Sequence, residues 1–524
     1  MTQPKVLLIY PPNQLNPQEM PRPDGSLGPL YLAAALDKAG IENDVVDASV
    51  GTKEQTLEQT FYRVVQQENG LIRIGMNYEE MKELIAKGGY NVVGIHSNFT
   101  PQTKMALEVA KAAKEVSPDI LVISGGVNAR NLSDRFFASG CLDVICYSEG
   151  EEIIVKIVRA WEKKAPWETV SGIMFVKDGK IVKTPLAPGD TKMNLDELPI
   201  PAWHKLPLDK YAAINSPHGN FDDSFTNRRY VYAPIMTSRG CPFKCSYCHI
   251  SKEREFLEDI GNLRLKSVER VLEEIKILKK LNVVKVYFED DSLLAKKSRV
   301  KQIFTKLRGE DLHIVDVNGV NLVHFLVRNK KTGKLETDRD YMEILKASGF
   351  DHIVFPVESA SQRILDKYAT SKLHLETMDL IEMARIAVDV GITCSVNMMI
   401  GFPDETEEEM RNSAAYGKRM VDAGAKHCSF FCPIPFPGSQ LYDYAIANGH
   451  LTPDFDPDFM NWFKPVMKNT VVSPERLLEL KQYLWETVNP RNYVEKRLQR
   501  NIGNRWSTGA LKKDPKEDKS EPAS

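Results

Sequence analysis

Short apolar runs alternate with amphipathic segments along most of the chain, and this alternation predicts its secondary structure. Apolar runs of strand length between turn residues, interspersed with helical spacing of apolar positions, are typical of βαβ units. In the first part of the chain the strand-like runs span residues 6–10, 44–47, 92–96, 120–124 and 144–147, and the helical segments span residues 30–38, 101–116 and 151–161. We therefore expect a doubly wound, Rossmann-like parallel sheet, followed by a hairpin that turns at Asp178 and Gly179.

The same alternation continues through a second region after residue 230. Its strand-like runs span residues 231–237, 284–288, 314–317, 352–357, 393–400 and 429–434. Ser267 is placed to cap a helix that extends to Leu281, with apolar residues on one face. Six consecutive βα units predict a partial (β/α)6 barrel of the TIM type, whose chemistry collects at the carboxyl ends of the strands.

Changes in composition divide the chain into regions. We expect the doubly wound domain at 1–190, a Pro-rich and aromatic linker in extended conformation at 191–230, the partial barrel at 231–450 and a mainly helical segment at 451–506. The last of these contains an amphipathic helix at 474–484 and a Pro- and aromatic-rich stretch at 453–465 that we expect to lie over the barrel mouth. The polar tail, 507–524, is predicted to be disordered, and 216–229 to form a surface loop.

The composition is that of a soluble enzyme and narrows the choice of partners. Hydrophobic residues make up 42% and charged residues 27%, and the formal net charge is −2. No overall basic field favours nucleic acid, and no apolar run is long enough to span a membrane. The apolar run near the amino terminus is too short for a signal peptide. The eight cysteines lack the pattern of a secreted protein, so we expect a reducing, cytoplasmic location.

The most informative stretch is TSRGCPFKCSYCH, residues 237–249, at the end of the first strand of the second region. It places Cys241, Cys245 and Cys248 in a C-x3-C-x2-C arrangement. Three thiolates on one loop can hold three irons of a 4Fe–4S cluster, and the fourth iron is then free to bind a cofactor or substrate. Gly240 permits a sharp turn before the first of these ligands.

A structural zinc site is the main alternative for these cysteines. It would combine them with His249 in a Cys3His set. Such sites usually draw their ligands from two separated pairs, whereas His249 directly follows Cys248. The spacing therefore favours the cluster. The remaining cysteines, Cys141, Cys146, Cys394, Cys428 and Cys432, show no such clustering and are expected to be packed thiols.

The cysteine motif, with Tyr247 before its last cysteine, resembles the signature of the radical SAM enzymes. In that family the open iron binds the amino and carboxylate groups of S-adenosylmethionine. Three later segments at predicted strand ends resemble the family's S-adenosylmethionine contacts. A GFPGET-like turn is one of them, with Asp404 in place of its usual second glycine. The contacts that the resemblance implies are Glu289, Asp290, Asp291, Glu358, Ser359, Ser361, Gly401, Phe402 and Pro403.

The first region resembles the cobalamin-binding domain that precedes the barrel in one large group of radical SAM enzymes. The resemblance rests on LGPLYLAAALDKAG, VVGIHSNF, ISGGVNAR and SEGEE. The D-x-H-x-x-G motif that supplies an axial histidine in other cobalamin proteins is absent, and His96 is expected to be a hydrogen-bonded loop residue. No G-x-G-x-x-G follows the first strand, so a dinucleotide is not indicated. The implied cobalamin contacts are Ser97, Asn98, Gly125, Gly126, Asn128, Glu149 and Gly150.

Together these resemblances imply a cobalamin-dependent radical S-adenosylmethionine C-methyltransferase that acts on an unactivated carbon of a small molecule. A 5′-deoxyadenosyl radical would abstract hydrogen, and methylcobalamin would supply the methyl group. An external electron donor such as flavodoxin or ferredoxin would reduce the cluster. Two alternatives stay open: a ring-forming or oxidative enzyme of the same family without net methylation, and a zinc-stabilised binding module without turnover.

Overall fold

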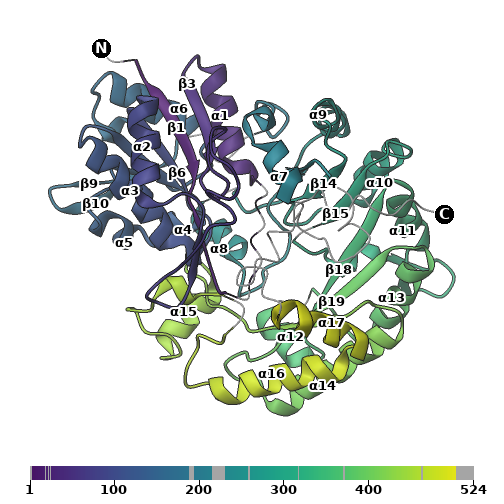
Figure 1. The fold of residues 1–524 in the computed structure, drawn as a ribbon. Helices are drawn as coiled ribbons and strands as arrows, with labels where there is room; N and C mark the ends of the chain where they lie inside the picture. Colours follow the sequence, from purple (N-terminus) through teal and green to yellow (C-terminus); the bar gives the residue numbers. More distant parts are fainter. Residues whose placement is uncertain are drawn as a thin grey trace.

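Two sheets, a mainly parallel one in the first half of the chain and a fully parallel one in the second, organise the protein (Figure 1). The computed structural model describes residues 3–502, apart from 18, 20, 22, 24, 188–189, 191–193, 215–229, 258–259, 317, 370–371 and 462–463. The predicted surface loop at 216–229 and the predicted disordered tail at 507–524 lie outside the described residues. Within the part of the chain that is described, no helix is long and apolar enough to cross a membrane.

The first sheet has seven strands and confirms the predicted doubly wound fold. Its order is β10-β9-β8-β7-β6-β1-β3, in which β3, β1, β6, β7 and β8 run parallel. The strands are β1 Lys5–Tyr10, β3 Glu42–Asp47, β6 Val92–His96, β7 Leu121–Gly125, β8 Val144–Cys146, β9 Ile173–Lys177 and β10 Lys180–Lys183. The order of strand addition reverses at β1, because β3 lies on one side of β1 and the next strand of the sheet, β6, lies on the other. Ligands of open α/β sheets bind at such a switch point, beyond the carboxyl ends of the strands.

The alternation of side chains along β1 shows why helices cover both faces of this sheet. Val6 and Leu8 pack into one apolar core with α1 and α6, whereas Leu7 and Ile9 pack into a second core with α2 and α3. Successive strand residues point to opposite faces, so a continuous apolar run requires cover on both sides. The helices are α1 Leu27–Lys38, α2 Tyr78–Gly88, α3 Thr103–Val116, α4 Val127–Asn131, α5 Ser133–Ala138 and α6 Glu151–Glu162.

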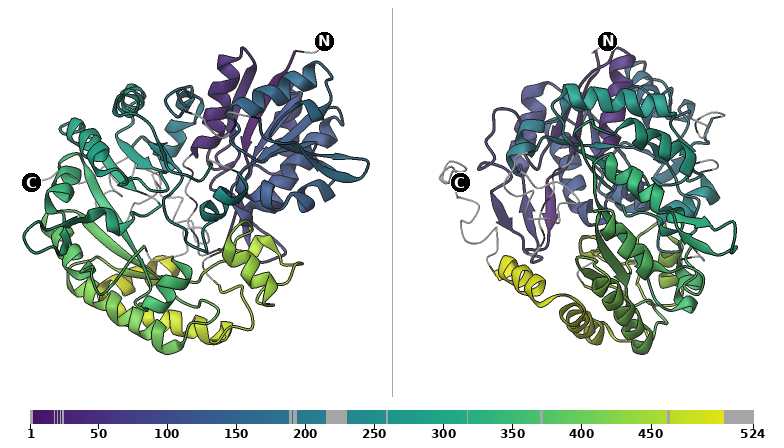
Figure 2. Two further views of the ribbon diagram at one scale, coloured as in Figure 1. Left: turned by 180° about the vertical axis from the view of Figure 1, so that it is seen from behind. Right: turned by 90° about the vertical axis from the view of Figure 1, so that its right-hand side faces the viewer.

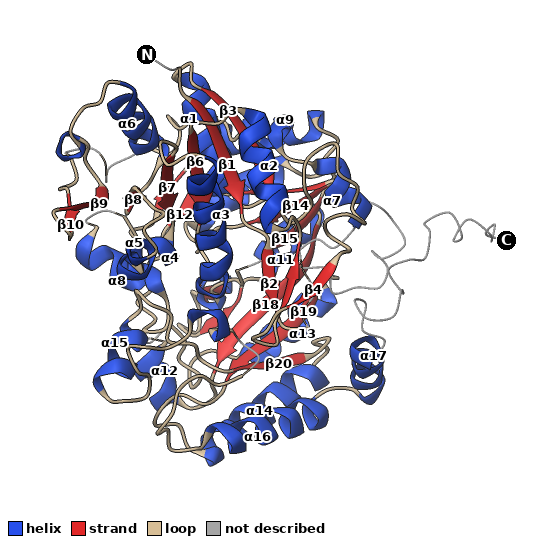
Figure 3. Ribbon diagram, turned by 60° about the vertical axis from the view of Figure 1, so that its left-hand side comes forward, coloured by secondary structure: helices blue, strands red, loops and turns tan. Residues whose placement is uncertain are grey.

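The second sheet has six parallel strands and confirms the predicted partial barrel. The strands follow each other in chain order, β11-β14-β15-β18-β19-β20, and curve with their helices on the outer side (Figure 1; strands are red in Figure 3). The six strands are β11 Tyr232–Ile235, β14 Lys285–Phe288, β15 His313–Asp316, β18 Phe350–Glu358, β19 Thr393–Met399 and β20 Cys428–Phe431. The helices are α9 Val268–Lys280, α10 Lys297–Lys306, α11 Arg339–Ala347, α12 Gln362–Tyr368, α13 Leu380–Asp389 and α14 Glu407–Asp422. Ser267 caps α9 as predicted, since its side chain accepts a hydrogen bond from the Arg270 N–H.

Part of the linker is helical, which corrects the prediction of an extended crossover. A 3-10 turn at Trp203–Lys205 is followed by helix α7, Leu208–Ile214. Tyr211 explains why this helix forms: it is fully buried, and its hydroxyl donates to Asp47 at 2.7 Å. Its ring also stacks on Tyr232 of the first barrel strand. The segment therefore packs between the two halves instead of crossing between them in extended form.

The C-terminal segment closes the far edge of the barrel. Helix α16, Pro474–Val488, begins after the Ser473 cap as predicted and packs beside α14, and α17, Arg491–Ile502, follows it (Figure 2). Between the two helices, the Asn489 side chain bonds both backbone groups of Cys428 on β20, at 2.7 Å and 2.8 Å. A single amide side chain thus pairs with the edge strand as a neighbouring strand would.

The described part of the stretch at 453–465 contacts the first domain. Its 3-10 turn, Pro457–Phe459, packs against the 3-10 turn Thr100–Gln102 that follows β6. The Asp458 carboxylate also accepts a hydrogen bond from Asn69, at 3.4 Å. The segment therefore connects the end of the barrel to the carboxyl edge of the first sheet.

Candidate functional site

The three clustered cysteines lie on the loop between the short strand β12, Ser238–Arg239, and helix α8, His249–Phe256. Gly240 begins the loop with φ of +80°, and a Cβ there would lie 2.3 Å from the Asn262 carbonyl oxygen. Only glycine fits such a close approach. Further along, the Ser246 N–H and hydroxyl both donate to the Tyr368 carbonyl, at 2.8 Å and 3.1 Å. The end of α12 thus holds the middle of the cysteine loop.

The cysteine thiols are close enough to influence one another. Burial raises the pKa of all three thiols, and neighbouring cysteines raise the pKa of Cys241 and Cys248 further. All three are free of disulfides. Among the described residues, no three His, Cys, Asp or Glu side chains converge as the ligands of a single ion would. In a cubane each thiolate would bind a different iron, so the three sulfurs need not converge on one point.

The three acidic residues after β14 make different contacts. Asp290 is fully buried, and its carboxylate accepts hydrogen bonds from the Thr237 N–H at 2.9 Å and from the Ser238 hydroxyl at 2.5 Å. Its oxygens are therefore used to fix the backbone that enters the cysteine loop. Asp291 accepts from the Gly240 N–H at 3.0 Å, and burial raises its pKa to about 7. Glu289 accepts from the Leu27 N–H of α1, at 3.3 Å.

Glu358, the last residue of β18, contacts the cysteine loop. The Glu358 carboxylate accepts hydrogen bonds from the Tyr247 hydroxyl and the Lys372 ammonium, both at 2.9 Å. Glu358 has φ of +68°, a conformation that is strained for a residue with a side chain. Ser359 is buried against Ser413, and Ser361 caps α12. Of this predicted group, only Glu358 is in direct contact with the cysteine loop through its side chain.

The turn after β19 is held by two acidic residues. Glu405 is buried and accepts from the N–H groups of Gly401 and Phe402, at 2.8 Å and 3.2 Å. The Phe402 ring stacks on Tyr368 with centroids 4.3 Å apart. Asp404, the departure from the family's glycine, accepts from the Tyr368 hydroxyl at 2.5 Å. The predicted residues Gly401, Phe402 and Pro403 are all buried.

Most of the polar loops of the first domain meet at the carboxyl edge of its sheet. Asn128 is buried, and its amide donates to the Ser97 hydroxyl at 3.0 Å, so both side chains support the loop from within. Asn98 is exposed, and its side-chain oxygen accepts from the Val127 N–H at 3.3 Å. Gly126 has φ of +101°, and a Cβ there would lie 2.5 Å from the Ser97 carbonyl oxygen. With Gly125 beside it, this edge is lined by small residues.

Glu149 is in contact with the other half of the protein. Its carboxylate accepts from both terminal nitrogens of Arg264, at 2.8 Å and 2.5 Å, and pairs with Arg239 at 3.1 Å. The two arginines face each other on the antiparallel strands β12 and β13, Arg264–Leu265. Arg239 also pairs with Glu151, the first residue of α6. Gly150 lies between these glutamates, and a Cβ there would contact Leu32 at 2.9 Å.

His96 and the scattered cysteines have ordinary structural surroundings. The His96 Nε2 lies 3.2 Å from the Ser26 hydroxyl, and its ring packs beside Tyr10. This confirms the prediction of a hydrogen-bonded residue at a strand end. Cys146, Cys394, Cys428 and Cys432 are buried and Cys141 is partly exposed, and all five are free thiols.

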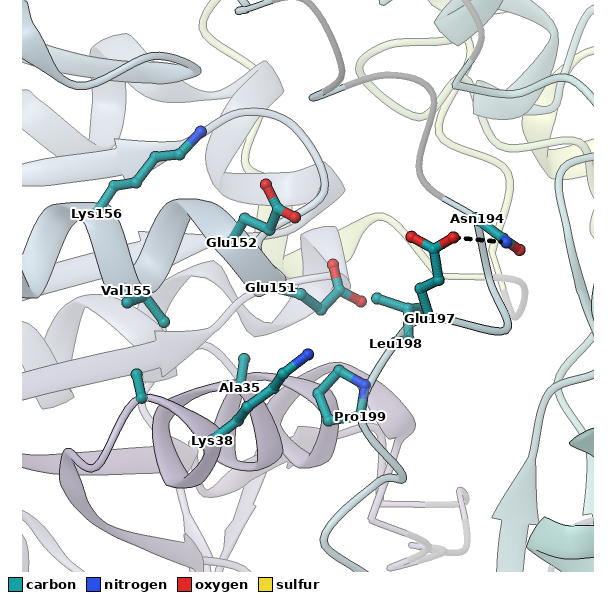
Figure 4. Close-up of a pocket in the computed structure, with 11 residues that line it drawn as sticks. Ala35, Lys38, Glu151, Glu152, Val155, Lys156, Asn194, Glu197, Leu198 and Pro199 are labelled. Atoms are coloured by element: carbon teal, nitrogen blue, oxygen red, sulfur yellow. Dashed lines mark hydrogen bonds between the residues drawn. The ribbon is translucent and has the colours of Figure 1, made fainter.

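A surface cleft of about 580 Å³ lies between α1, α6 and residues 194–199, and none of the three cysteines lines it (Figure 4). Lys38 and Glu152 face it from the two helices, and Glu197, bonded to Asn194 at 3.0 Å, faces it from the linker. Glu151 also lines the cleft. None of the cleft's lining residues is a barrel strand end, so the cleft does not coincide with the predicted centre of chemistry.

Sequence reasoning missed several charged residues near the cysteines. Arg239, Arg264 and Lys372 were not singled out, since an isolated cation in a sequence does not show its partner. The position of Arg239, two residues before Cys241 at the end of a strand, is the one available signal. Lys372 is buried and lies close enough to Cys245 to influence its pKa.

Comparison with known proteins places this geometry in context. The family model of the Radical SAM superfamily matches residues 235–416, and that of the B12 binding domain matches residues 25–158. The chain is 28% identical to an uncharacterized methyltransferase of Pyrococcus horikoshii over 94% of each chain. It is 26% identical to the cytidylyl-2-hydroxyethylphosphonate methyltransferase of Streptomyces wedmorensis, over 86% of this chain and 83% of that one.

A solved structure shares the overall fold. The radical S-adenosylmethionine methyltransferase TsrM of Kitasatospora setae, with cobalamin and a [4Fe–4S] cluster bound, superposes with a TM-score of 0.59 at 15% identity. The match covers 86% of this chain and 80% of that one. The two chains therefore share their fold over most of their length.

Proposed function

Because this chain belongs to the radical SAM enzymes that carry a cobalamin-binding domain, we propose that it is a cobalamin-dependent C-methyltransferase acting on a small molecule. The cluster and S-adenosylmethionine together supply a carbon-centred radical, and cobalamin supplies the methyl group. The reacting carbon is one that an ordinary nucleophilic methyl transfer cannot reach, which is why radical chemistry is needed.

One observation carries this proposal: the cysteine loop lies against the carboxyl edge of the cobalamin-binding domain. Glu149 and Glu151 belong to that edge, and Arg239 precedes the first cysteine by two residues. The proposed sites for the radical-generating cofactor and for the methyl donor would therefore lie on neighbouring elements. Transfer between two cofactors requires such an arrangement.

The roles of individual residues follow from their contacts. Cys241, Cys245 and Cys248 would hold the cluster, and their free thiols on one loop fit that donor set. Asp291, which accepts from the Gly240 N–H, would receive the amino group of S-adenosylmethionine, and Glu358, which accepts from the Tyr247 hydroxyl, would face its ribose. The small residues Ser97, Asn98, Gly125, Gly126 and Gly150 would border the corrin. An external one-electron donor such as flavodoxin or ferredoxin would reduce the cluster.

The first test is the cofactor content of the protein, purified anaerobically with cobalamin supplied and then reconstituted. We expect about four irons, equivalent sulfide and about one cobalt per chain. Cys248→Ala should lose most of the iron, whereas the matched variant of a packed thiol, Cys394→Ala, should retain it. Zinc in place of iron would refute the enzyme hypothesis, and iron without cobalt would refute the methyl-transfer assignment.

Product mass then separates methylation from the ring-forming alternative. With S-adenosylmethionine carrying a labelled methyl group, a methyltransferase adds one labelled carbon to its product. A cyclase or oxidase of the same family changes the hydrogen or oxygen count and transfers no label. A product without label would favour the ring-forming reaction.

A further inference from the structure

Four ion pairs connect the cobalamin-binding domain to the segment that carries the cysteines. Arg239 and Arg264, on the two strands next to the loop, pair with Glu149. Arg239 also pairs with Glu151. On the other side of the loop, Glu253 of α8 pairs with Arg130 of α4. The cysteine loop is thus tied to the first domain both before its first cysteine and after its last.

Burial distinguishes these pairs from ordinary surface ion pairs. The side chains of Arg239, Glu149 and Glu151 are 15%, 11% and 6% exposed, and those of Arg130 and Glu253 are 10% and 11% exposed. Charges removed from water persist only when they are paired with good geometry. A surface pair can open at little cost, but these pairs cannot open without leaving charges buried and unpaired.

Arg239 has the geometry of a rigid connector. One terminal nitrogen faces Glu149 and the other faces Glu151, and the guanidinium lies over the Tyr31 ring of α1, 4.9 Å from its centroid. Planar guanidinium groups hold two carboxylates in a fixed relation, which an ammonium cannot do. Through these contacts Arg239 connects two elements of the cobalamin-binding domain with the backbone that leads to Cys241.

We propose that Arg239 is a positioning residue that fixes the distance between the cluster and cobalamin, with the Arg130–Glu253 pair as its counterpart beyond the loop. Glu149 and Glu151 then serve this connection and not the corrin. This inference rests on the proposed function, since it assumes that both cofactors bind. A few buried ion pairs would then set the distance between two cofactors that are bound by separate domains.

The test is a distance measurement by pulsed electron paramagnetic resonance between the reduced cluster and cob(II)alamin in the holoenzyme. Arg239→Lys keeps the positive charge but loses the planar guanidinium that holds two carboxylates at once. We expect a broadened or shifted distance distribution, unchanged iron and cobalt content, and a fall in kcat of about tenfold to a hundredfold with little change in the KM for S-adenosylmethionine. Arg476→Lys on α16, which pairs with Glu407 on the protein surface, is the matched control and should behave as wild type.

An unchanged distance distribution with kcat within about twofold of wild type would overturn the proposal. Glu149→Gln, which keeps an acceptor but removes the charge, is the second variant and should broaden the distribution as well. Scanning calorimetry separates this failure from failure of the proposed function. If the wild-type protein binds no cobalt, the proposed function is wrong. The first domain of Arg239→Lys should even then unfold at a lower temperature than the first domain of the wild-type protein. Unfolding that remains identical to wild type would then refute the connection itself.

Discussion

Glu405 makes the folding stability of the barrel depend on pH in a direction that can be worked out from its surroundings. The side chain is 0% exposed, and only Oε2 is hydrogen-bonded, to the N–H groups of the turn after β19. Oε1 has no hydrogen-bond partner in the described part of the protein. Burial raises the pKa of this carboxyl from 4.5 to about 8, so the folded protein holds a proton there at neutral pH.

The sign follows from proton binding in the two states. The unfolded chain releases this proton near its ordinary pKa, whereas the folded chain keeps it until about pH 8. The stability linked to this proton is therefore complete below pH 4.5 and is lost as the pH rises toward the folded pKa. Between about pH 5.5 and 8.5, wild type should lose about 3 kcal/mol of unfolding free energy through this one group.

Glu405→Gln cannot titrate and should remove this loss. We expect its unfolding free energy, measured by urea titration of the cofactor-free protein at several pH values, to decline less with pH than that of wild type. Over that pH range, the unfolding free energy of wild type should fall by about 3 kcal/mol more than that of Glu405→Gln. Glu343→Gln on the exposed face of α11 is the control and should follow wild type. Parallel curves for wild type and Glu405→Gln would refute the reasoning.

Three further substitutions test the supports of the site. Asp404→Gly removes the partner of the Tyr368 hydroxyl and should lower the unfolding free energy by about 1–2 kcal/mol, measured by urea titration, and raise the KM for S-adenosylmethionine. Asn489→Ala leaves both backbone groups of Cys428 without their partners and should cost about 2–4 kcal/mol in the same titration. Lys266→Met removes the ammonium from a buried ion pair and should cost about 3–5 kcal/mol; a loss below about 1 kcal/mol would show that the pair behaves like a surface one.

The sequence pattern was sufficient for the main strands and insufficient for the smaller elements. Long apolar runs predicted both parallel sheets, since burial on both faces leaves little choice of structure. The small sheet of β2 Asn13–Leu15, β5 Ile72–Ile74 and β4 Val64–Gln66 was missed because its strands have only three residues each. Helix α2 was also missed, although Asn77 and Glu80 form a capping box that a closer search would have found.

The part of the candidate site that a local motif determines could be predicted from the sequence. The part that depends on contacts between distant residues could not. The cysteine spacing alone indicated three ligands on one loop. Nothing in the sequence showed that Glu149 has two arginines as partners, because Arg239 and Arg264 are about a hundred residues away along the chain. Asp290 and Asn128 were likewise predicted as cofactor contacts, but their side chains are buried in contacts that support neighbouring loops.

The pairing of Asn489 with β20 has a consequence for how copies of this protein meet one another. An open barrel leaves two edge strands with free backbone groups, and such edges template the addition of strands from other molecules. At β20 the Asn489 amide occupies the Cys428 N–H and C=O, and α16 covers the same strand. A chain shortened before α16 would keep its cysteine loop but expose this edge, and we expect it to aggregate through strand pairing rather than remain a smaller working enzyme.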